Sequence, residues 1–147
     1  MNLNKIAQKI LRDNMYLSLS TCAQNKPWIA PLFYRVGNNN ELYFASQPTS
    51  IHCQNIRKNP KVALAIFDSH QKEGTGVGIQ AAGKAEMLDA RSQILEALKH
   101  YRTDFFKVTA DSFLGKAKYR MYKITPSVFY FNDPRVKTDR RVEVKLG

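Results

Sequence analysis

The spacing of hydrophobic residues changes several times along the chain, and each change marks the start of an expected element. Near the N-terminus apolar residues recur with the period of a helix, at Leu3, Ile6, Ala7, Ile10 and Leu11. From residue 16 the apolar positions alternate, which predicts a first strand over residues 16–21. Polar residues at 24–27 indicate a turn, so a second strand over residues 28–36 should complete a hairpin.

The second expected strand is apolar on both of its faces. One face carries Trp28, Ala30, Leu32, Tyr34 and Val36, and the other carries Ile29, Pro31 and Phe33. A strand with one solvent face would alternate apolar and polar residues, so one face should meet the core and the other a helix, a ligand or another subunit. Because Pro31 has no N–H to donate, it predicts an edge, a bulge or a break in pairing, which could face a ligand.

Later parts of the chain repeat these strand and helix patterns. The expected strands cover residues 41–46, 62–67, 77–88, 119–124 and 128–132. The last two should be broken at Thr125 and Pro126, and Gly78 and Gly83 predict bulges or close backbone approach. The expected helices cover residues 50–59 and 90–102, with a further helical turn within residues 103–118. Six or seven strands, mostly in meander order, predict a small barrel or a sandwich.

Length, composition and charge narrow the class of protein. A chain of 147 residues is expected to be one domain, residues 1–147, and no apolar run approaches the roughly 18 residues of a membrane span. The N-terminus lacks the apolar core of a secretory signal, so we expect a cytoplasmic protein with reduced cysteines. The net charge of +11 favours an anionic partner, which could be nucleic acid, a phosphorylated small molecule or an acidic surface. We expect the basic C-terminal end to be a solvated tail, with a binding arm as the alternative.

The chain lacks the usual patterns of metal and nucleophile chemistry. His52, His70 and His100 stand far apart, with no carboxylate at metal-ligand spacing, so we expect no metal site. Cys53 adjoins His52, but neighbours on a helix point about 100° apart and make a poor catalytic pair. An enzyme built on this chain would therefore need a cofactor that brings its own chemistry.

The turn before the helix at 50–59 holds Ser46, Thr49 and Ser50. A helix start leaves N–H groups without partners and carries partial positive charge, so hydroxyls gathered there can bind a phosphate. Ordinary helix capping by the same residues is the alternative. Nearby aromatic residues could border a planar ring or simply pack the core.

Several segments together resemble the FMN-binding split barrels related to pyridoxamine 5'-phosphate oxidase. The points of resemblance are the strand at 16–21 and the segments at 26–34, 42–46, 50–56, 59–64 and 80–86. The resemblance implies a mainly β fold, a six- to seven-stranded split β-barrel with two or three peripheral helices. It also implies a homodimer with FMN in clefts at the subunit interface, and a flavin-dependent oxidoreductase acting on an unidentified small molecule.

The resemblance assigns roles to three stretches and one further residue. The flavin ring would lie near Ala30, Pro31 and Leu32, and Gln80 would come near the ring edge. The ribityl chain would be flanked by Tyr43, Phe44, Ala45 and Ser46, and the phosphate would be approached by Ser50, Ile51 and His52.

Two features depart from the family pattern. Ile51 and His52 stand where the family usually offers a lysine, often after an arginine. Either FMN binding is weaker and pH-dependent, unless Arg57 or Lys58 compensates, or the site holds another occupant, such as deazaflavin or haem. The C-terminus lacks the longer substrate segment of true pyridoxamine phosphate oxidases, so we do not expect vitamin B6 oxidation.

Two alternative functions remain open. A haem-binding or haem-degrading relative that uses His70 or His100 is one alternative. A non-catalytic module that binds nucleic acid is the other, although aromatics and cations do not interleave as such modules require.

Overall fold

The structure is a computed structural model that describes residues 1–105 and 107–147; Phe106 lies outside the described residues. The helices are α1 (Leu3–Asp13), α2 (Ile51–Lys58), α3 (Arg91–Leu98) and the short 3-10 helix η1 (Ala110–Phe113). The strands are β1 (Tyr16–Ala23), β2 (Lys26–Phe33), β3 (Arg35–Val36), β4 (Leu42–Ser46), β5 (Lys61–Phe67), β6 (Gly78–Leu88), β7 (Arg120–Asn132) and β8 (Arg141–Val144). The helical turn expected within residues 103–118 is therefore present as η1.

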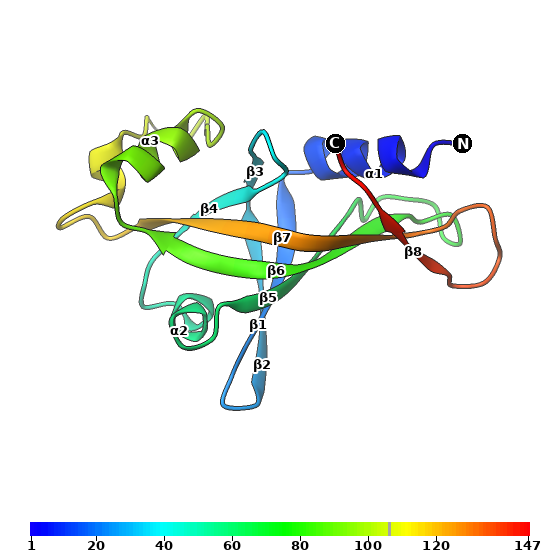
Figure 1. Ribbon diagram of the computed structural model, residues 1–147, viewed down its shortest axis with the longest axis horizontal. Helices are drawn as coiled ribbons and strands as arrows, with labels where there is room; N and C mark the ends of the chain where they lie inside the picture. Colours follow the sequence, from blue (N-terminus) through cyan, green and yellow to red (C-terminus); the bar gives the residue numbers. More distant parts are fainter. Residues whose placement is uncertain (106) are drawn as a thin grey trace.

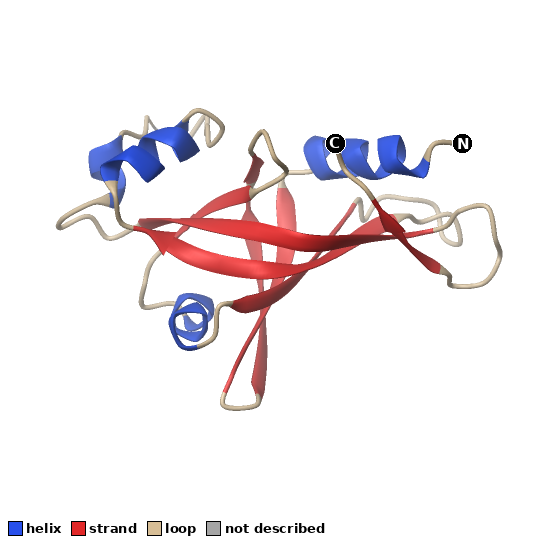
Figure 2. Ribbon diagram, in the orientation of Figure 1, coloured by secondary structure: helices blue, strands red, loops and turns tan. Residues whose placement is uncertain are grey.

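The described strands form one antiparallel sheet in the order β2-β1-β5-β6-β7-β4-β3, with β8 paired to β7. β2 and β3 stand at opposite ends of this order, although only Tyr34 separates them in the chain. The sheet must therefore curl until its two ends meet, as Figure 1 shows, while the helices stay at its periphery in Figure 2. Within the described residues no ladder joins these two ends, which confirms the expected mainly β split barrel.

The hairpin of β1 and β2 projects from the barrel beside α2 (Figure 1). Its turn consists of Gln24 and Asn25, which both have positive φ, at 53° and 61°. Two successive residues in this conformation match the twist of the flanking strands, so a two-residue turn joins them tightly. The predicted hairpin is confirmed, with its tip at the expected polar residues.

Two groups of buried residues fill the fold. The larger fills the barrel and includes Leu17, Leu19, Leu32, Phe44, Ile66, Ile79, Tyr122 and Phe131. The α1 residues Ala7 and Leu11 complete it, so the predicted amphipathic helix covers one end of the barrel. The smaller group lies under α3 and η1 and includes Tyr43, Leu88, Ile94, Ala97, Tyr101, Phe113 and Met121.

The prediction of two short strands broken at Thr125 and Pro126 is wrong, because β7 is continuous. β7 carries one extra residue, Ser127, between the pairs Ala82–Val128 and Gly83–Pro126. Pro126 also lies beyond the stretch of β7 that pairs with β4, so its missing N–H costs no bond on that side. A bulge thus accommodates the proline inside a long strand.

Other expected boundaries also shift. The second expected strand is interrupted at Tyr34, whose hydroxyl donates to the Leu11 carbonyl at 2.5 Å and whose backbone N–H donates to Met15. α3 ends at Leu98 and not at residue 102. The basic C-terminal end is not only a solvated tail, because β8 pairs there with the last residues of β7.

Candidate functional site

Three predicted phosphate-site residues meet at the start of α2. Ser50 is the N-cap of this helix, and its side chain accepts from the Cys53 backbone N–H at 3.4 Å. The His52 Nε2 lies 2.8 Å from the Ser46 Oγ and 3.3 Å from the Ser50 Oγ. The capping role of Ser50 is therefore real, and its hydroxyl also lies beside a second hydroxyl and an imidazole.

His52 is buried, with only 9% of its surface exposed, and its ring packs near Phe44. Burial lowers the pKa of this imidazole below its ordinary value of 6.5, because a desolvated ring disfavours the charged form. The ring is therefore neutral at pH 7 and adds no fixed positive charge to the start of α2.

The lowered pKa of His52 makes the stability of the protein depend on pH. Below pH 6.5 the unfolded chain binds more protons at this residue than the folded chain does, so the free energy of unfolding should fall as the pH drops from about 7 toward 5. Urea unfolding at several pH values measures this loss. His52→Gln keeps a polar side chain that does not titrate, so its unfolding midpoint should change less over the same range; equal pH dependence in both proteins would contradict the assignment.

The cations proposed from sequence do not reach the start of α2. Arg57 and Lys58 lie in the last turn of this helix, at the opposite end from Ser50. The sheet register instead brings Arg120 of β7 directly beside Ser46 of β4. Its guanidinium donates to the carbonyls of Gly115, Ala117 and Tyr119 at 2.6–2.9 Å, which ties down the chain before β7. No sequence signal marked Arg120, because strand pairing alone brings it there.

β2 is an edge strand, as Pro31 predicted. In an antiparallel pair, residues that bond to the neighbouring strand alternate with residues whose N–H and C=O point away. The Tyr34 N–H bonds to the Met15 carbonyl, so the alternation assigns Ala30 and Leu32 to the β1 ladder. The backbone groups on the free edge belong to Ile29, Pro31 and Phe33.

The side chains of the predicted ring site point to both sides of β2. Ala30 and Leu32 are buried in the main core, whereas Pro31 is exposed on the outside of the sheet. Ile29, on the same side as Pro31, is 65% exposed. Both sides of this strand were expected to be covered. Within this chain the side that carries Ala30 and Leu32 is covered, and the side that carries Ile29 and Pro31 is open.

The outside of the sheet across β2, β1, β5, β6 and β7 carries mostly small side chains, both apolar and polar, and is here called the outer face. Its central row, read from the strand register, is Pro31, Ser18, Ala65, Gln80 and Tyr130. The adjacent row is Ile29, Ser20, Ala63, Ala82 and Val128. Three strand spacings of about 4.8 Å separate Pro31 from Gln80, so one chain does not bring these two predicted site residues together.

The remaining predicted site residues occupy different surroundings. Tyr43 and Phe44 are buried in the smaller and larger core groups, and Phe44 stacks on Tyr122 with centroids 5.0 Å apart. Ala45 packs against the smaller group together with Phe33 of β2, which links β4 to the free edge. Ile51 is exposed in the first turn of α2.

The histidines and cysteines are dispersed in the structure. The His70 side chain is exposed on the loop before β6, and the His100 ring lies parallel to Tyr43 with centroids 6.1 Å apart. Among the described residues no three side chains of His, Cys, Asp or Glu gather as metal ligands. Cys22 and Cys53 are both free thiols.

An antiparallel sheet that curls into a barrel but leaves a free strand edge, with helices at its periphery, defines the split β-barrel class of proteins. The sequence profile of the family described as pyridoxamine 5'-phosphate oxidase matches residues 3–133. The chain therefore belongs to the pyridoxamine 5'-phosphate oxidase-like family of split barrels. No curated protein matches the chain significantly.

Solved structures share this fold over nearly the whole chain. General stress protein 26 from Bacillus anthracis is 19% identical, with a TM-score of 0.66 over 98% of this chain and 100% of that one. An FAD-binding protein from Mesorhizobium loti is 22% identical, with a TM-score of 0.69 over 86% and 91%. A heme binding protein from Mycobacterium smegmatis is 13% identical, with a TM-score of 0.72 over 98% and 58%. Likeness at these identities establishes the fold alone.

In the described part of the chain, none of the helices has the length and apolar character that crossing a membrane requires.

Proposed function

We propose that this chain is a cytoplasmic, homodimeric flavoprotein that binds FMN between two copies and acts as an oxidoreductase on a small molecule. The whole chain, residues 1–147, forms one flavin-binding domain in this proposal. Family membership supports the oxidoreductase part of the proposal, because the family is described by the name of an oxidase, pyridoxamine 5'-phosphate oxidase. The neighbouring FAD-binding fold supports a flavin in general.

The observation that carries the proposal is a free strand edge next to a helix start rich in hydroxyls. α2 contacts β2, and β2 contacts β4, the strand that leads into the start of α2, so these three elements are neighbours. A flavin ring carries carbonyl oxygens and an N–H along one edge, which the free C=O of Pro31 and the free N–H and C=O of Phe33 complement. The hydroxyls of Ser46 and Ser50 lie where a phosphate at the other end of the cofactor is expected.

The hydrogen-bond donors at the start of α2 are backbone N–H groups and hydroxyls, so they would bind a phosphate mainly through neutral groups. The first N–H groups of a helix and its partial positive charge favour an anion, and the two hydroxyls add further donors. Arg120, beside Ser46, is a fixed cation on the neighbouring strand. FMN would supply the redox chemistry when bound, and the chain's own residues bind and orient it.

A second copy of the chain would complete the site in this proposal. The outer face exposes alanine, serine, proline and isoleucine side chains that a partner would cover. Gln80 lies on this face three strands from Pro31. In a two-fold dimer formed through the outer face, Gln80 of one copy can approach the β2 edge of the other, which its own chain does not allow.

A visible absorption spectrum of the purified protein, repeated after adding FMN and desalting, tests the proposal. We expect two retained flavin bands, and light scattering during size-exclusion chromatography should report twice the chain mass. A single intense Soret band would instead establish the haem alternative. A protein that retains no chromophore after FMN is added would overturn the proposal.

Ser50→Ala should weaken FMN binding about tenfold or more, because a hydrogen bond to a charged phosphate contributes roughly 1.5–3 kcal/mol. The same substitution removes a helix cap and should cost about 1 kcal/mol of stability. Asn2→Ala is the matched control, since Asn2 caps α1 in the same way and lies at the N-terminus. Fluorescence titration with FMN should separate the two variants, and equal affinity in both would remove Ser50 from the phosphate site.

A further inference from the structure

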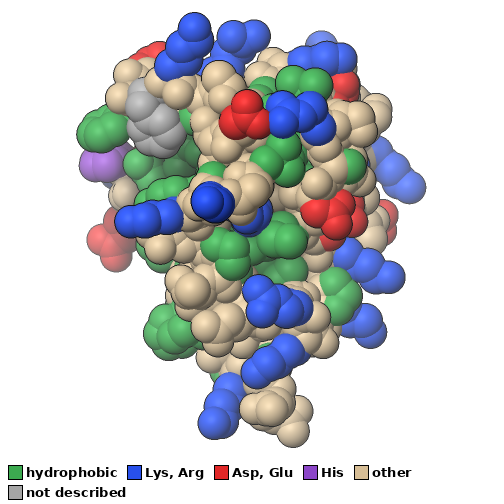
Figure 3. All heavy atoms as spheres, turned by 90° about the vertical axis from the view of Figure 1, so that its left-hand side faces the viewer, with side chains coloured by type: hydrophobic (Ala, Val, Ile, Leu, Met, Phe, Trp, Pro, Cys, Tyr) green, Lys and Arg blue, Asp and Glu red, His purple; other side chains and the backbone are tan. Residues whose placement is uncertain are grey.

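A pocket of about 310 Å³ lies between α2 and the end of β6, and we call it the α2–β6 pocket. Ligand pockets in proteins start at about this volume, roughly 300 Å³. Figure 3, which views the molecule from the end that carries α2 and α3, shows apolar side chains in the middle of this face with lysine and arginine side chains around them. The lining of the pocket includes Cys53, Ile56, Arg57, Ala85, Met87 and Tyr122.

The pocket exists because β6 is longer than the strand that pairs with it on one side. The last pair of the β5–β6 ladder is Lys61–Lys84, and one further bond joins the Ala85 N–H to the Pro60 carbonyl. β6 continues to Leu88, and α2 lies beside this extension in place of a strand. A helix with its side chains is about 10–12 Å wide, so it cannot close against a strand edge at the spacing of about 4.8 Å that paired strands have. A space therefore remains between them.

Met87 has an unpaired backbone N–H at this edge of β6. In an antiparallel sheet, residues that bond to one neighbouring strand alternate with residues that bond to the other. The Ala85 N–H points toward β5, so the Met87 N–H points to the same side, beyond the last pair of that ladder. Among the described residues no backbone hydrogen bond outside the ladders reaches Met87. An acceptor atom of a ligand in the pocket would satisfy this donor.

The floor of the pocket is part of the barrel core. Four of its residues have at most 5% of their surface exposed: Cys53, Ile56, Ala85 and Tyr122. Burial raises the pKa of the Tyr122 hydroxyl above its ordinary value, the contact with the Cys53 thiol raises it further, and the nearby cation Arg57 acts in the opposite direction. The hydroxyl is therefore a neutral donor at pH 7, and its polar neighbour is a thiol, which is only a weak acceptor.

Arg57 supplies positive charge at the rim of the pocket. Its side chain is exposed and takes part in no ion pair within residues 1–105 and 107–147. Glu86 also borders the pocket, but it lies between Ala85 and Met87 on β6, and successive side chains of a strand point to opposite sides of the sheet. The Glu86 carboxylate is thus on the other side, where Lys123 is its register partner. Glu86 therefore does not neutralise Arg57.

We propose that the α2–β6 pocket binds a small carboxylate with an unbranched apolar tail, the chemistry of a medium-chain fatty acid. The carboxylate accepts from the Arg57 guanidinium, the Tyr122 hydroxyl and the Met87 N–H, and hydrogen bonds to an ionised acceptor are about twice as strong as neutral ones. Tyr122 and Met87 stand directly opposite each other in the β6–β7 register, which brings two of these donors together. The tail lies on the apolar floor, along Ile56 and Ala85.

The pocket is separate from the proposed flavin site. Ala85 and Tyr122 belong to the main core, so the pocket is on the inner side of the sheet and not on the outer face. Dimer formation through the outer face leaves it open. Binding of a carboxylate and retention of a flavin are therefore independent properties.

Isothermal titration calorimetry with octanoate, and with octanol as a neutral probe of the same chain length, tests the proposal. We expect one saturable site per chain for octanoate and binding of octanol that is weaker by about tenfold, because the donors favour an ionised acceptor. The heat-capacity change should be negative, since apolar surface is buried. Absence of octanoate binding, or equal affinity for the two probes, would overturn the proposal.

Nuclear magnetic resonance of protein labelled with ¹⁵N-methionine tests the location of the site. The sequence has only four methionines, so the amide signal of Met87 can be assigned with the variant Met87→Leu. Octanoate should shift the Met87 amide signal and leave that of Met15, which precedes β1, unchanged. Bound octanoate that leaves the Met87 signal unchanged would overturn the assignment.

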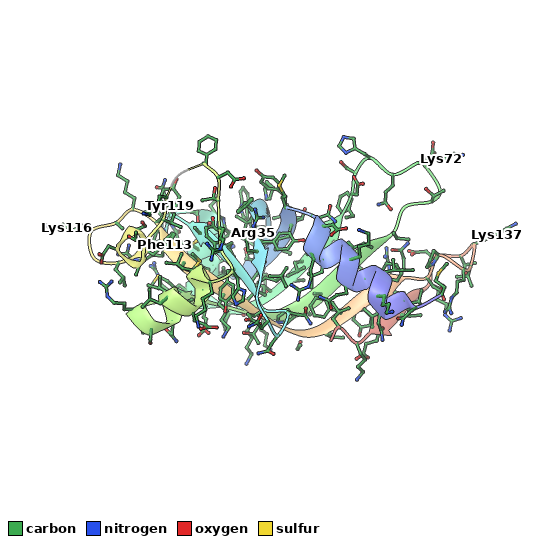
Figure 4. All side chains as sticks on the ribbon, turned by 90° about the horizontal axis from the view of Figure 1, so that it is seen from above. Arg35, Lys72, Phe113, Lys116, Tyr119 and Lys137 are labelled. Carbon is green, nitrogen blue, oxygen red and sulfur yellow. The ribbon has the colours of Figure 1, made fainter. Side chains whose placement is uncertain are left out.

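Arg57→Gln should weaken octanoate binding by about tenfold and remove the preference for octanoate over octanol. Lys58→Gln and Lys137→Gln are the controls, because each removes the same charge. Lys58 follows Arg57 in the chain but does not line the pocket, and Figure 4 places Lys137 at the opposite end of the long axis from Tyr119, the residue before β7. Both controls should bind octanoate as the wild type does. Equal losses in all three variants would reduce the effect to net charge and overturn the site.

Discussion

Ala65→Glu is expected to convert the protein from a dimer into a monomer and to abolish retention of FMN. Ala65 lies at the centre of the outer face, paired with Ser18 on one side and Gln80 on the other. In an isolated chain the new carboxylate points to solvent and costs little. In the proposed dimer it would be buried without a partner, at roughly 3–5 kcal/mol, which weakens association more than 100-fold.

Light scattering during chromatography and the flavin spectrum measure both consequences of Ala65→Glu. Leu95→Glu is the control. Leu95 is exposed on α3, so this substitution introduces the same charge away from the outer face. The control should remain a flavin-binding dimer. A dimeric Ala65→Glu protein with bound flavin would show that the outer face is not the interface, whereas a monomer that keeps flavin would show that one chain holds the cofactor.

Gly83→Ala should destabilise the fold by about 2–3 kcal/mol, the upper range for overpacking against rigid neighbours. A Cβ at this position would lie 2.4 Å from the Thr125 carbonyl oxygen and 2.8 Å from the Pro126 Cα. Both contacts are with the backbone of β7, next to the bulge at Ser127, so no side-chain rotation relieves them. Either β6 and β7 separate locally or the bulge is lost.

Urea unfolding followed by circular dichroism measures the cost of Gly83→Ala. Gly76→Ala is the control, because among the described residues the only atom within 4 Å of a Cβ there is the end of the Gln71 side chain, at 3.8 Å. The control should unfold within about 0.5 kcal/mol of the wild type, as ordinary surface substitutions do. Equal stability of the two variants would show that β6 and β7 can move apart at Gly83 with little cost in the free energy of unfolding.

Local sequence patterns predicted the elements well because they depend on neighbours a few residues apart. The helical period of α1, the alternation in β1, the hairpin turn at Gln24 and Asn25 and the Ser50 cap are all short-range features. Gly83 was identified as a point of close approach, and the observed contacts with β7 agree. The combined order of these segments also indicated the split-barrel family.

The predicted strand boundaries were wrong where pairing between distant parts of the chain overrides a local sequence signal. Pro126 indicated a break in β7, but the bulge and the end of the β4 ladder remove its cost. The strand β8 forms in a charged segment with little strand pattern, because the exposed edge at the end of β7 supplies its partner.

The sequence by itself determined the family, most of the helices and strands, and the gathering of hydroxyls at the start of α2. Only the tertiary structure decided that His52 turns inward to Ser46, that Arg120 pairs with Ser46 in the sheet, and that Gln80 lies three strands from Pro31. The reason is physical: strand register and the curl of the sheet relate residues that are far apart in the chain. No local period encodes those relations.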